Sequence, residues 1–305
     1  MDPLELIQQG KVKRYFRASR KLNAAGMVFH ITQHAAGKEP LFLENSDYLT
    51  MVWMLKELAR SHSVDFYAFC LMPNHVHLLC SFKTANLYDA MRDLFARYAM
   101  RFNQKYERKG HLFAGPYRQA VCLDEAYVVA ASLYIHLNPV KAGLAQSPGL
   151  YRWSSCRLYE RRPRQESFVV PDFVLGLLSP NLQQARERYQ ALLTQGMGIE
   201  MRASGEDKKA VENFLTRMAS KVPALWSWLR ERSGDRDSPS TALDQCELWE
   251  DRIVSMKREG LSRKPETRAA WRHVIEQLIA RGYKREEIAE RLGISRKTVY
   301  NLVRH

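Results

Sequence analysis

The sequence predicts an α+β fold followed by an all-α region. Over residues 27–140, short apolar stretches and stretches of helical periodicity follow in the order strand, helix, strand, strand, helix, strand, helix. Only two residues separate the second and third strands, so these strands are expected to pair as an antiparallel hairpin. This order is typical of a ferredoxin-like sandwich, in which helices pack against a mainly antiparallel sheet.

The first half of this domain begins with a strand over Met27–Gln33, which is rich in β-branched and aromatic residues. A helix is expected from Ser46, because apolar residues then recur three and four positions apart. The hairpin comprises Phe66–Met72 and His75–Ser81, and the turn signal Pro73-Asn74 joins them.

The second half begins with an amphipathic helix over Leu87–Tyr106, whose large apolar side chains share one face. The last strand is expected over Phe113–Cys122. Asp124 is expected to cap a helix over Glu125–Asn138. Pro139 should end this helix, because the residue before a proline avoids helical backbone angles.

Three parts are expected along the chain: a sheet domain over 1–160, a helical connecting region over 161–240, and a helix-turn-helix domain over 241–305. Arg161–Ser167 has the composition of an exit linker. Ser233–Ser240 is a polar break between the second and third parts.

The helix-turn-helix is expected near the C-terminus, at Arg285–Leu302. Ala289 is small where two helices would cross, Gly293 suits the turn, and Ser295 is a good cap for the second helix. The pattern resembles the helix-turn-helix of bacterial recombinases and regulators, and an ordinary helical hairpin is the alternative. Its recognition face would consist of Ser295, Arg296, Lys297, Thr298 and Asn301.

The charge of the chain favours a polyanionic partner. The chain has 47 Lys and Arg against 33 Asp and Glu, a formal net charge of +14 and an isoelectric point near 9.6. Residues 251–305 contain fourteen basic and seven acidic residues, so half of the excess lies in the last part. Duplex DNA is therefore the expected partner of the C-terminal region.

Cysteine usage and hydropathy indicate a cytoplasmic protein. The five cysteines are widely spaced and form no C-x-x-C pair, which argues against a disulfide framework or a zinc knuckle. The N-terminus lacks an apolar signal core, and no apolar run reaches the roughly 18 residues that a membrane span requires. No membrane partner is expected. The cysteines are Cys70, Cys80, Cys122, Cys156 and Cys246.

The most informative motif is the hairpin segment 71–79, which contains His75 and His77. Side chains two apart in a strand share a face, so the two imidazoles converge while Val76 enters the core. This is half of a metal site. In the later helix, Tyr134 and Asn138 lie one turn apart and add a phenol and an amide oxygen.

Together, PNHVHLL and YIHLNPVKAG resemble the His-hydrophobic-His single-tyrosine DNA transposases, especially the REP-associated tyrosine transposases, over about residues 14–158. The resemblance implies a metal-dependent single-stranded DNA endonuclease and strand transferase acting beside DNA hairpins. Tyr134 would be the nucleophile and form a 5′-phosphotyrosine link. His75, His77 and Asn138 would bind Mg²⁺ or Mn²⁺, and imidazole ligands favour Mn²⁺. The active unit would be a monomer or a homodimer.

Other residues are candidates for DNA contacts or for alternative roles. The basic N-terminal stretch and the region after the long helix supply the candidate DNA contacts Lys13, Arg14, Arg17 and Arg118. Three further histidines, His30, His34 and His136, are interpreted as structural or surface residues, and an approach of His30 and His34 to the substrate is the alternative. Tyr98, Tyr106 and Tyr117 are alternative nucleophiles. The functional alternatives are a non-catalytic, sequence-specific DNA-binding regulator on the same fold, and a replication initiator or relaxase.

Overall fold

The structure is a computed structural model that describes residues 23, 25–37, 39–122, 125–161, 167–199, 210–221, 271–272, 275 and 285–303. Several predicted features lie outside these residues. They are the N-terminal contacts Lys13, Arg14 and Arg17, the helix cap Asp124, and most of the two predicted linkers.

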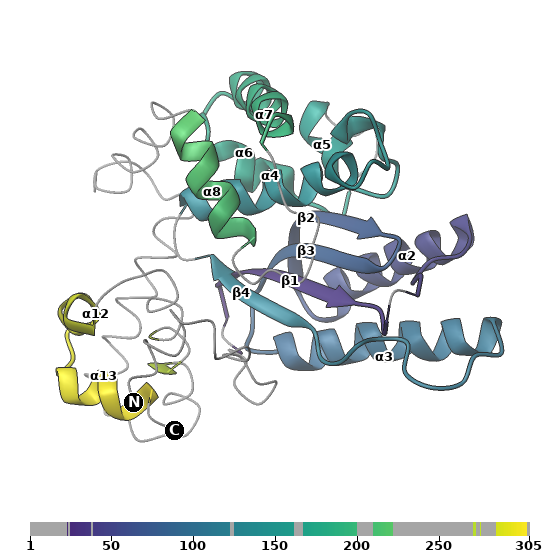
Figure 1. Ribbon diagram of the computed structural model, residues 1–305, viewed down its shortest axis with the longest axis horizontal. Coiled ribbons are helices and arrows are strands. Elements are labelled where there is room, and N and C mark those ends of the chain that lie inside the picture. Colours follow the sequence, from purple (N-terminus) through teal and green to yellow (C-terminus); the bar gives the residue numbers. More distant parts are fainter. Residues whose placement is uncertain are drawn as a thin grey trace.

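A four-stranded antiparallel sheet forms the centre of the first domain (Figure 1). The strand order is β2-β3-β1-β4, as in a ferredoxin-like fold, so the predicted α+β class is confirmed. The Pro73-Asn74 turn joins β2 to β3, and its carbonyls accept backbone N–H groups of Leu41 and Ala35. The strands are β1 (Val28–His34), β2 (Val64–Met72), β3 (His75–Phe82) and β4 (Arg118–Cys122).

The strand β4 is shorter than the predicted Phe113–Cys122. Phe113 makes only an isolated bridge to Ala35, and the chain then passes through Gly115, whose φ is 151°. Pro116 has no N–H to donate to a neighbouring strand, so regular pairing begins only after it. The side chain of Gln33 donates to the Gly115 carbonyl at 2.9 Å and holds this irregular stretch against β1.

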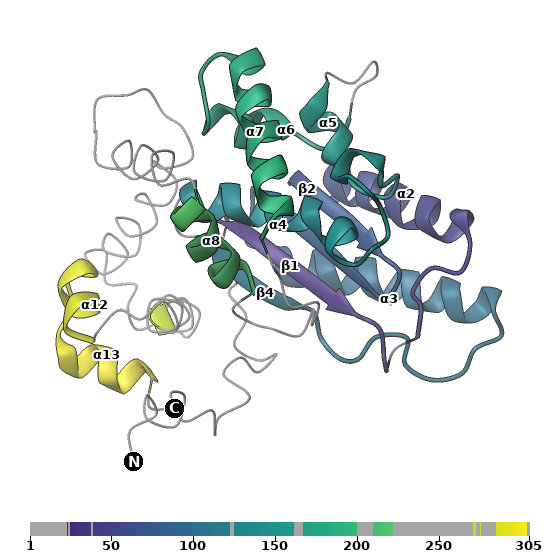
Figure 2. The same ribbon diagram turned by 45° about the horizontal axis from the view of Figure 1, so that its top comes forward.

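Two helices cover one face of the sheet, and a third covers the other (Figure 2). The helices α2 (Asn45–Ser61) and α3 (Leu87–Lys105) pack on the first face. Alternate apolar residues of the central strands, such as Phe29 and Ile31, enter that core. Burying such a side chain contributes roughly 1.5–3 kcal/mol, so this layer holds the sheet firmly.

The helix α4 (Glu125–Lys141) covers the opposite face and is buried along almost its whole length. The sequence predicts that Pro139 ends this helix, and that prediction is wrong. Pro139 has no N–H, so one backbone hydrogen bond of the helix is missing. Backbone hydrogen bonds continue beyond it, since the Ala142 N–H donates to the Asn138 carbonyl and the Leu144 N–H donates to the Pro139 carbonyl. Only one bond is lost near the helix end, and burial on several sides outweighs that loss.

Four further helices form an outer layer against α4 (Figure 1). Their apolar residues join those of α4 and β2 in one continuous cluster, so α4 lies between the sheet and this layer. The predicted domain boundary at residue 160 stays a prediction. The outer elements are α5 (Cys156–Glu160), α6 (Pro171–Gly176), α7 (Leu182–Met197) and α8 (Ala210–Lys221), with the short 3-10 turn η2 (Pro148–Leu150) beside them.

The C-terminal helix pair is the predicted helix-turn-helix, formed by α12 (Arg285–Arg291) and α13 (Arg296–Val303). Gly293 in the turn has a φ of 60°, which favours glycine. The Ser295 hydroxyl accepts the N–H of Thr298 at 3.0 Å and caps α13, as predicted. Apolar residues of the two helices form a small core, in which Ile288, Ala289, Leu292, Val299 and Leu302 are buried and Ile294 packs against them.

Within the described part of the chain, no helix combines the length and apolar character that crossing a membrane requires.

Candidate active site

Polar side chains occupy one end of the sheet face that α4 covers. In the pairing of β1 with β3, Thr32 lies opposite His77 and His34 lies opposite His75. Directly opposed residues share a face, and so do residues two apart in one strand, so His30 belongs to the same group. The polar group therefore comes from alternate residues of two neighbouring strands.

The two predicted ligand histidines lie side by side at the start of β3. The ring centroids of His75 and His77 are 4.8 Å apart with an interplanar angle of 89°. Burial, followed by the nearby His34, lowers the pKa of His75 to about 3. Burial, followed by the nearby histidines, also places the pKa of His77 well below its usual range. Both imidazoles are thus neutral at neutral pH, as metal ligation requires.

Each of these imidazoles has a hydrogen-bond contact on its Nδ1 side. His75 Nδ1 lies 2.7 Å from Asn74 Oδ1, and His77 Nδ1 lies 3.0 Å from His30 Nε2. The Thr32 hydroxyl is a second, longer contact of His77 Nδ1 at 3.3 Å. The Nε2 atoms of His75 and His77 are buried and have no hydrogen-bond partner among the described residues.

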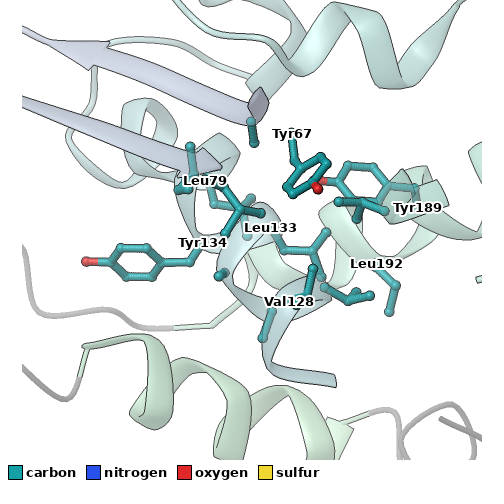
Figure 3. Packing of buried hydrophobic residues seen from close by; sticks show 14 of the residues in the cluster. Tyr67, Leu79, Val128, Leu133, Tyr134, Tyr189 and Leu192 are labelled. Carbon is teal, nitrogen blue, oxygen red and sulfur yellow. The ribbon is translucent and has the colours of Figure 1, made fainter. Parts of the chain in front are cut away.

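The predicted nucleophile Tyr134 lies against these histidines in the same chain. Its ring centroid is 5.7 Å from that of His77 and 6.1 Å from that of His30, in both cases edge to face. Tyr134 belongs to the same apolar cluster as Tyr67 and Tyr189, and Figure 3 shows its hydroxyl end pointing away from those two side chains. The α8 residue Phe214 packs on the Tyr134 ring at 6.1 Å, and the tyrosine side chain is only 5% exposed.

Asn138 follows Tyr134 by one turn of α4 and is partly buried. Its Nδ2 donates to the Tyr134 carbonyl at 2.8 Å, so the amide nitrogen is engaged within the helix. The Oδ1 atom is the end that remains for a ligand, and the role of Asn138 as an oxygen ligand stays a prediction.

The donor atoms of the three predicted ligands have the chemistry that suits a divalent cation. Two buried Nε2 atoms that the described residues leave without partners, together with one amide oxygen, make a neutral nitrogen and oxygen donor set. Among the described residues, no group of three His, Cys, Asp or Glu side chains is arranged to hold a metal. The predicted set contains only two such residues, so this finding does not count against it.

Arg118 lies on the same sheet face as the histidines. It begins the edge strand β4 and is paired with Thr32, which is itself paired with His77. The three residues therefore form a row across three strands, with the exposed Arg118 at its outer end. This placement is compatible with the predicted contact to a DNA phosphate.

The alternative tyrosines lie elsewhere. Tyr98 and Tyr106 belong to the α3 side of the sheet, where Tyr98 OH donates to the Leu41 carbonyl and Tyr106 OH donates to Asp47. Tyr117 is buried in the same core as Tyr98. None of the three shares the sheet face of His75 and His77.

His136 is buried on the far side of α4 from the predicted site, and burial lowers its pKa to about 3. Its two ring nitrogens contact Tyr189 OH and Ser155 Oγ, each at 2.8 Å. The Ser155 hydroxyl also accepts the Phe69 N–H at 2.9 Å. The interpretation of His136 as a packing residue therefore agrees with its surroundings.

Residues 24–138 match the family model described as "Transposase IS200 like". Over these residues the chain is similar to an IS200-like transposase domain. This similarity points to DNA transposition, with enzymatic cleavage and joining of DNA. His75, His77, Tyr134 and Asn138 all lie within the matched residues of the transposase domain.

Residues 266–305 match a homeodomain-like domain model, in agreement with the helix-turn-helix. In that motif, all five predicted recognition residues (Ser295, Arg296, Lys297, Thr298 and Asn301) are exposed.

A solved structure of a REP-associated tyrosine transposase bound to a REP hairpin is also similar to part of this chain. The match has a TM-score of 0.41 and 14% sequence identity, and it covers 48% of this chain and 84% of that chain. No curated protein matches the sequence.

Sequence reasoning missed three residues of this site: His30, Thr32 and Asn74. The available signal was the alternation in β1, where His30, Thr32 and His34 are polar and Phe29 and Ile31 are apolar. A strand with a polar face beside a His-x-His strand indicates a shared site. The pairing partner of β1 is not local information, so the signal becomes clear only in the folded sheet.

Proposed function

We propose that this transposase is a metal-dependent single-stranded DNA endonuclease and strand transferase that acts through a 5′-phosphotyrosine at Tyr134. The observation that carries the proposal is the position of Tyr134, whose ring lies 5.7 Å from that of His77. A phenol beside a buried, neutral imidazole that is a proposed metal ligand suits nucleophilic attack on a metal-bound phosphate.

Cleavage is a displacement at phosphorus. The Tyr134 oxygen forms a bond to phosphorus while the bond from phosphorus to the 3′ oxygen breaks. The phenol proton is released to solvent, and the departing oxygen takes up a proton to become a free 3′-OH. The phosphotyrosine keeps the energy of the phosphodiester, so another 3′-OH can attack it and restore Tyr134 without ATP.

The metal site belongs to His75, His77 and Asn138. These residues would hold Mg²⁺ or Mn²⁺, which supplies charge neutralisation and orientation for the attacked phosphate. Because all three ligands are neutral, they do not reduce the positive charge offered to the DNA. Arg118 adds a second positive group on the same face and contacts a neighbouring phosphate.

The protein environment holds the nucleophile in place. Tyr134 is on a buried helix, and the sheet histidines and Phe214 restrict its ring from two sides. This restriction lowers the entropic cost of bringing the phenol to the phosphate. One chain supplies both Tyr134 and the histidines, which supports a monomer as a sufficient cleaving unit; a homodimer remains compatible with this arrangement.

The substrate is single-stranded DNA that carries hairpins, such as REP-like sequences. The helix-turn-helix binds duplex DNA through the exposed face of α13 and keeps the enzyme near its targets. The basic excess of residues 251–305 supports this division of roles.

The test is incubation of the full chain with single-stranded hairpin oligonucleotides and Mn²⁺ or Mg²⁺, followed by denaturing electrophoresis. A covalent protein–DNA adduct is expected. Tyr134→Phe should abolish the adduct and preserve DNA binding, whereas the matched control Tyr98→Phe, on the opposite side of the sheet, should retain it. An adduct formed by Tyr134→Phe would refute the nucleophile, and a wild-type protein that binds without any adduct would favour the non-catalytic regulator.

A further inference from the structure

His30 in β1 and His77 in β3 form a buried pair of imidazoles at the proposed metal site. His30 Nε2 and His77 Nδ1 are 3.0 Å apart, and the rings are stacked with centroids 5.2 Å apart. Both side chains are buried, with exposed fractions of 7% and 2%. A neutral imidazole has one N–H nitrogen and one nitrogen with a lone pair. One ring of this pair therefore donates the hydrogen bond and the other accepts it.

We propose that His30 is the positioning residue of the metal site: it accepts the Nδ1 proton of His77 and thereby keeps the Nε2 lone pair of His77 available for the cation. This inference rests on the proposed function, because it assumes that His77 is a ligand. His30 itself does not touch the cation.

The surroundings of His77 Nε2 decide which of the two rings donates in this hydrogen bond. If His77 carried its proton on Nε2, a buried N–H would have no acceptor among the described residues. With the proton on Nδ1, the hydrogen bond to His30 is made, and the buried Nε2 lone pair serves as the ligand. A histidine ligand commonly donates its other N–H to a neighbouring acceptor, which fixes its tautomer and its ring orientation.

His30 is suited to accept this proton. Its Nε2 lies 3.0 Å from His77 Nδ1, and a neutral imidazole offers a lone pair at one of its two ring nitrogens. The stacked rings and the adjacent Tyr134, 6.1 Å from His30, restrict its movement. Thr32 is the competing acceptor, but its hydroxyl is farther from His77 Nδ1, at 3.3 Å.

The second ligand has an equivalent arrangement from a different residue. His75 Nδ1 lies 2.7 Å from Asn74 Oδ1, and a carbonyl oxygen can only accept, so His75 carries its proton on Nδ1. Both imidazoles thus present the same atom, Nε2, to the metal. The two supporting residues come from β1 and from the hairpin turn, which fixes both rings before any cation binds.

The direct test uses the wild-type chain without metal. Long-range proton–nitrogen correlation spectra of protein labelled with ¹⁵N-histidine report the tautomer of each ring, and a His77→Gln spectrum assigns the His77 signals. The expected result is a proton on Nδ1 and a lone pair on Nε2 of His77. The opposite tautomer would overturn the proposal without any need for a folded His30 variant.

The second test measures Mn²⁺ affinity by calorimetry for His30→Leu, which removes the acceptor, and for His30→Gln, whose Oε1 can replace it. His30→Leu should bind Mn²⁺ about 10- to 100-fold more weakly, and His30→Gln should recover most of the affinity. Thr32→Val should have a smaller effect than His30→Leu. The matched control is His136→Gln, a buried histidine that contacts neither ligand, and it should bind Mn²⁺ as the wild type does.

Wild-type Mn²⁺ affinity in a folded His30→Leu protein would refute the role of His30, and so would a loss confined to Thr32→Val. If His30→Leu does not fold, the role of His30 is judged from two other measurements. These are the tautomer of His77 in the wild-type spectrum and the Mn²⁺ affinity of His30→Gln. The covalent adduct assay is separate. A missing adduct with the expected tautomer and affinities would refute the cleavage activity alone, whereas an adduct with the opposite tautomer would refute His30 alone.

Discussion

Replacement of His136 by glutamine should flatten the dependence of stability on pH. His136 has a pKa of about 3 in the folded chain against 6.5 when exposed, because burial disfavours the charged imidazole. The folded state therefore favours the neutral form of His136 more strongly than the unfolded state does. The stability that depends on this neutral form is fully present above pH 6.5 and is lost as the pH falls towards 3.

These pKa values give a loss of about 2 kcal/mol between pH 7 and pH 5 for this one group. The assay is urea unfolding of wild type and His136→Gln at pH 7, 6 and 5 without divalent cations. Glutamine does not titrate, so the wild type should lose about 2 kcal/mol more than the variant over this range. At pH 7 the variant should be less stable by about 1 kcal/mol, for one lost hydrogen bond. Equal losses in both proteins would show that the fold does not hold His136 neutral.

Three further predictions concern other parts of the chain. Phe214→Ala should lower the free energy of unfolding by about 3–5 kcal/mol in urea, because Phe214 is buried against Tyr134, whereas Leu150→Ala at an exposed position should change it little. Arg118→Gln should reduce the salt dependence of single-stranded DNA binding, measured by fluorescence anisotropy, by about 0.7 in the log–log slope and leave Mn²⁺ affinity unchanged; an unchanged slope would count against a phosphate contact. Ser295→Ala removes the cap of α13 and should cost about 1 kcal/mol locally, seen as roughly fivefold faster amide exchange in α13 and unchanged exchange in α4.

The order of elements in the transposase domain was predictable because its strands and helices have distinct hydrophobic periods. The hairpin is the clearest case, since Pro73-Asn74 separates two apolar runs that pair as expected. The two errors have tertiary causes. β4 begins only at Arg118, after an irregular stretch that the Gln33 side chain holds, and α4 passes through Pro139 because it is buried on both sides.

The candidate site was only partly predictable, for a related reason. Spacings of two in a strand and four in a helix place His75 with His77 and Tyr134 with Asn138, and both are local properties. The approach of Tyr134 to His77 depends on α4 packing across the sheet, which the family resemblance implied and local spacing alone could not give. His30 was interpreted as a packing residue because its role depends on which strand lies beside β1.

The position of α4 also explains why the described chain continues well beyond the matched transposase residues 24–138. The inner side of α4 carries Tyr134 to the histidines, and its outer side packs on α7, where Gly196 leaves room for Leu137. A Cβ atom at residue 196 would lie 2.5 Å from the Leu137 Cδ1, so the two helices approach closely only because glycine is there. The Lys141 side chain at the end of α4 donates to the Met197 carbonyl at 2.6 Å and stabilises the same contact between α4 and α7. The proposed nucleophile Tyr134 is therefore positioned from both sides, and the outer helices act on the candidate site by fixing the helix that carries Tyr134.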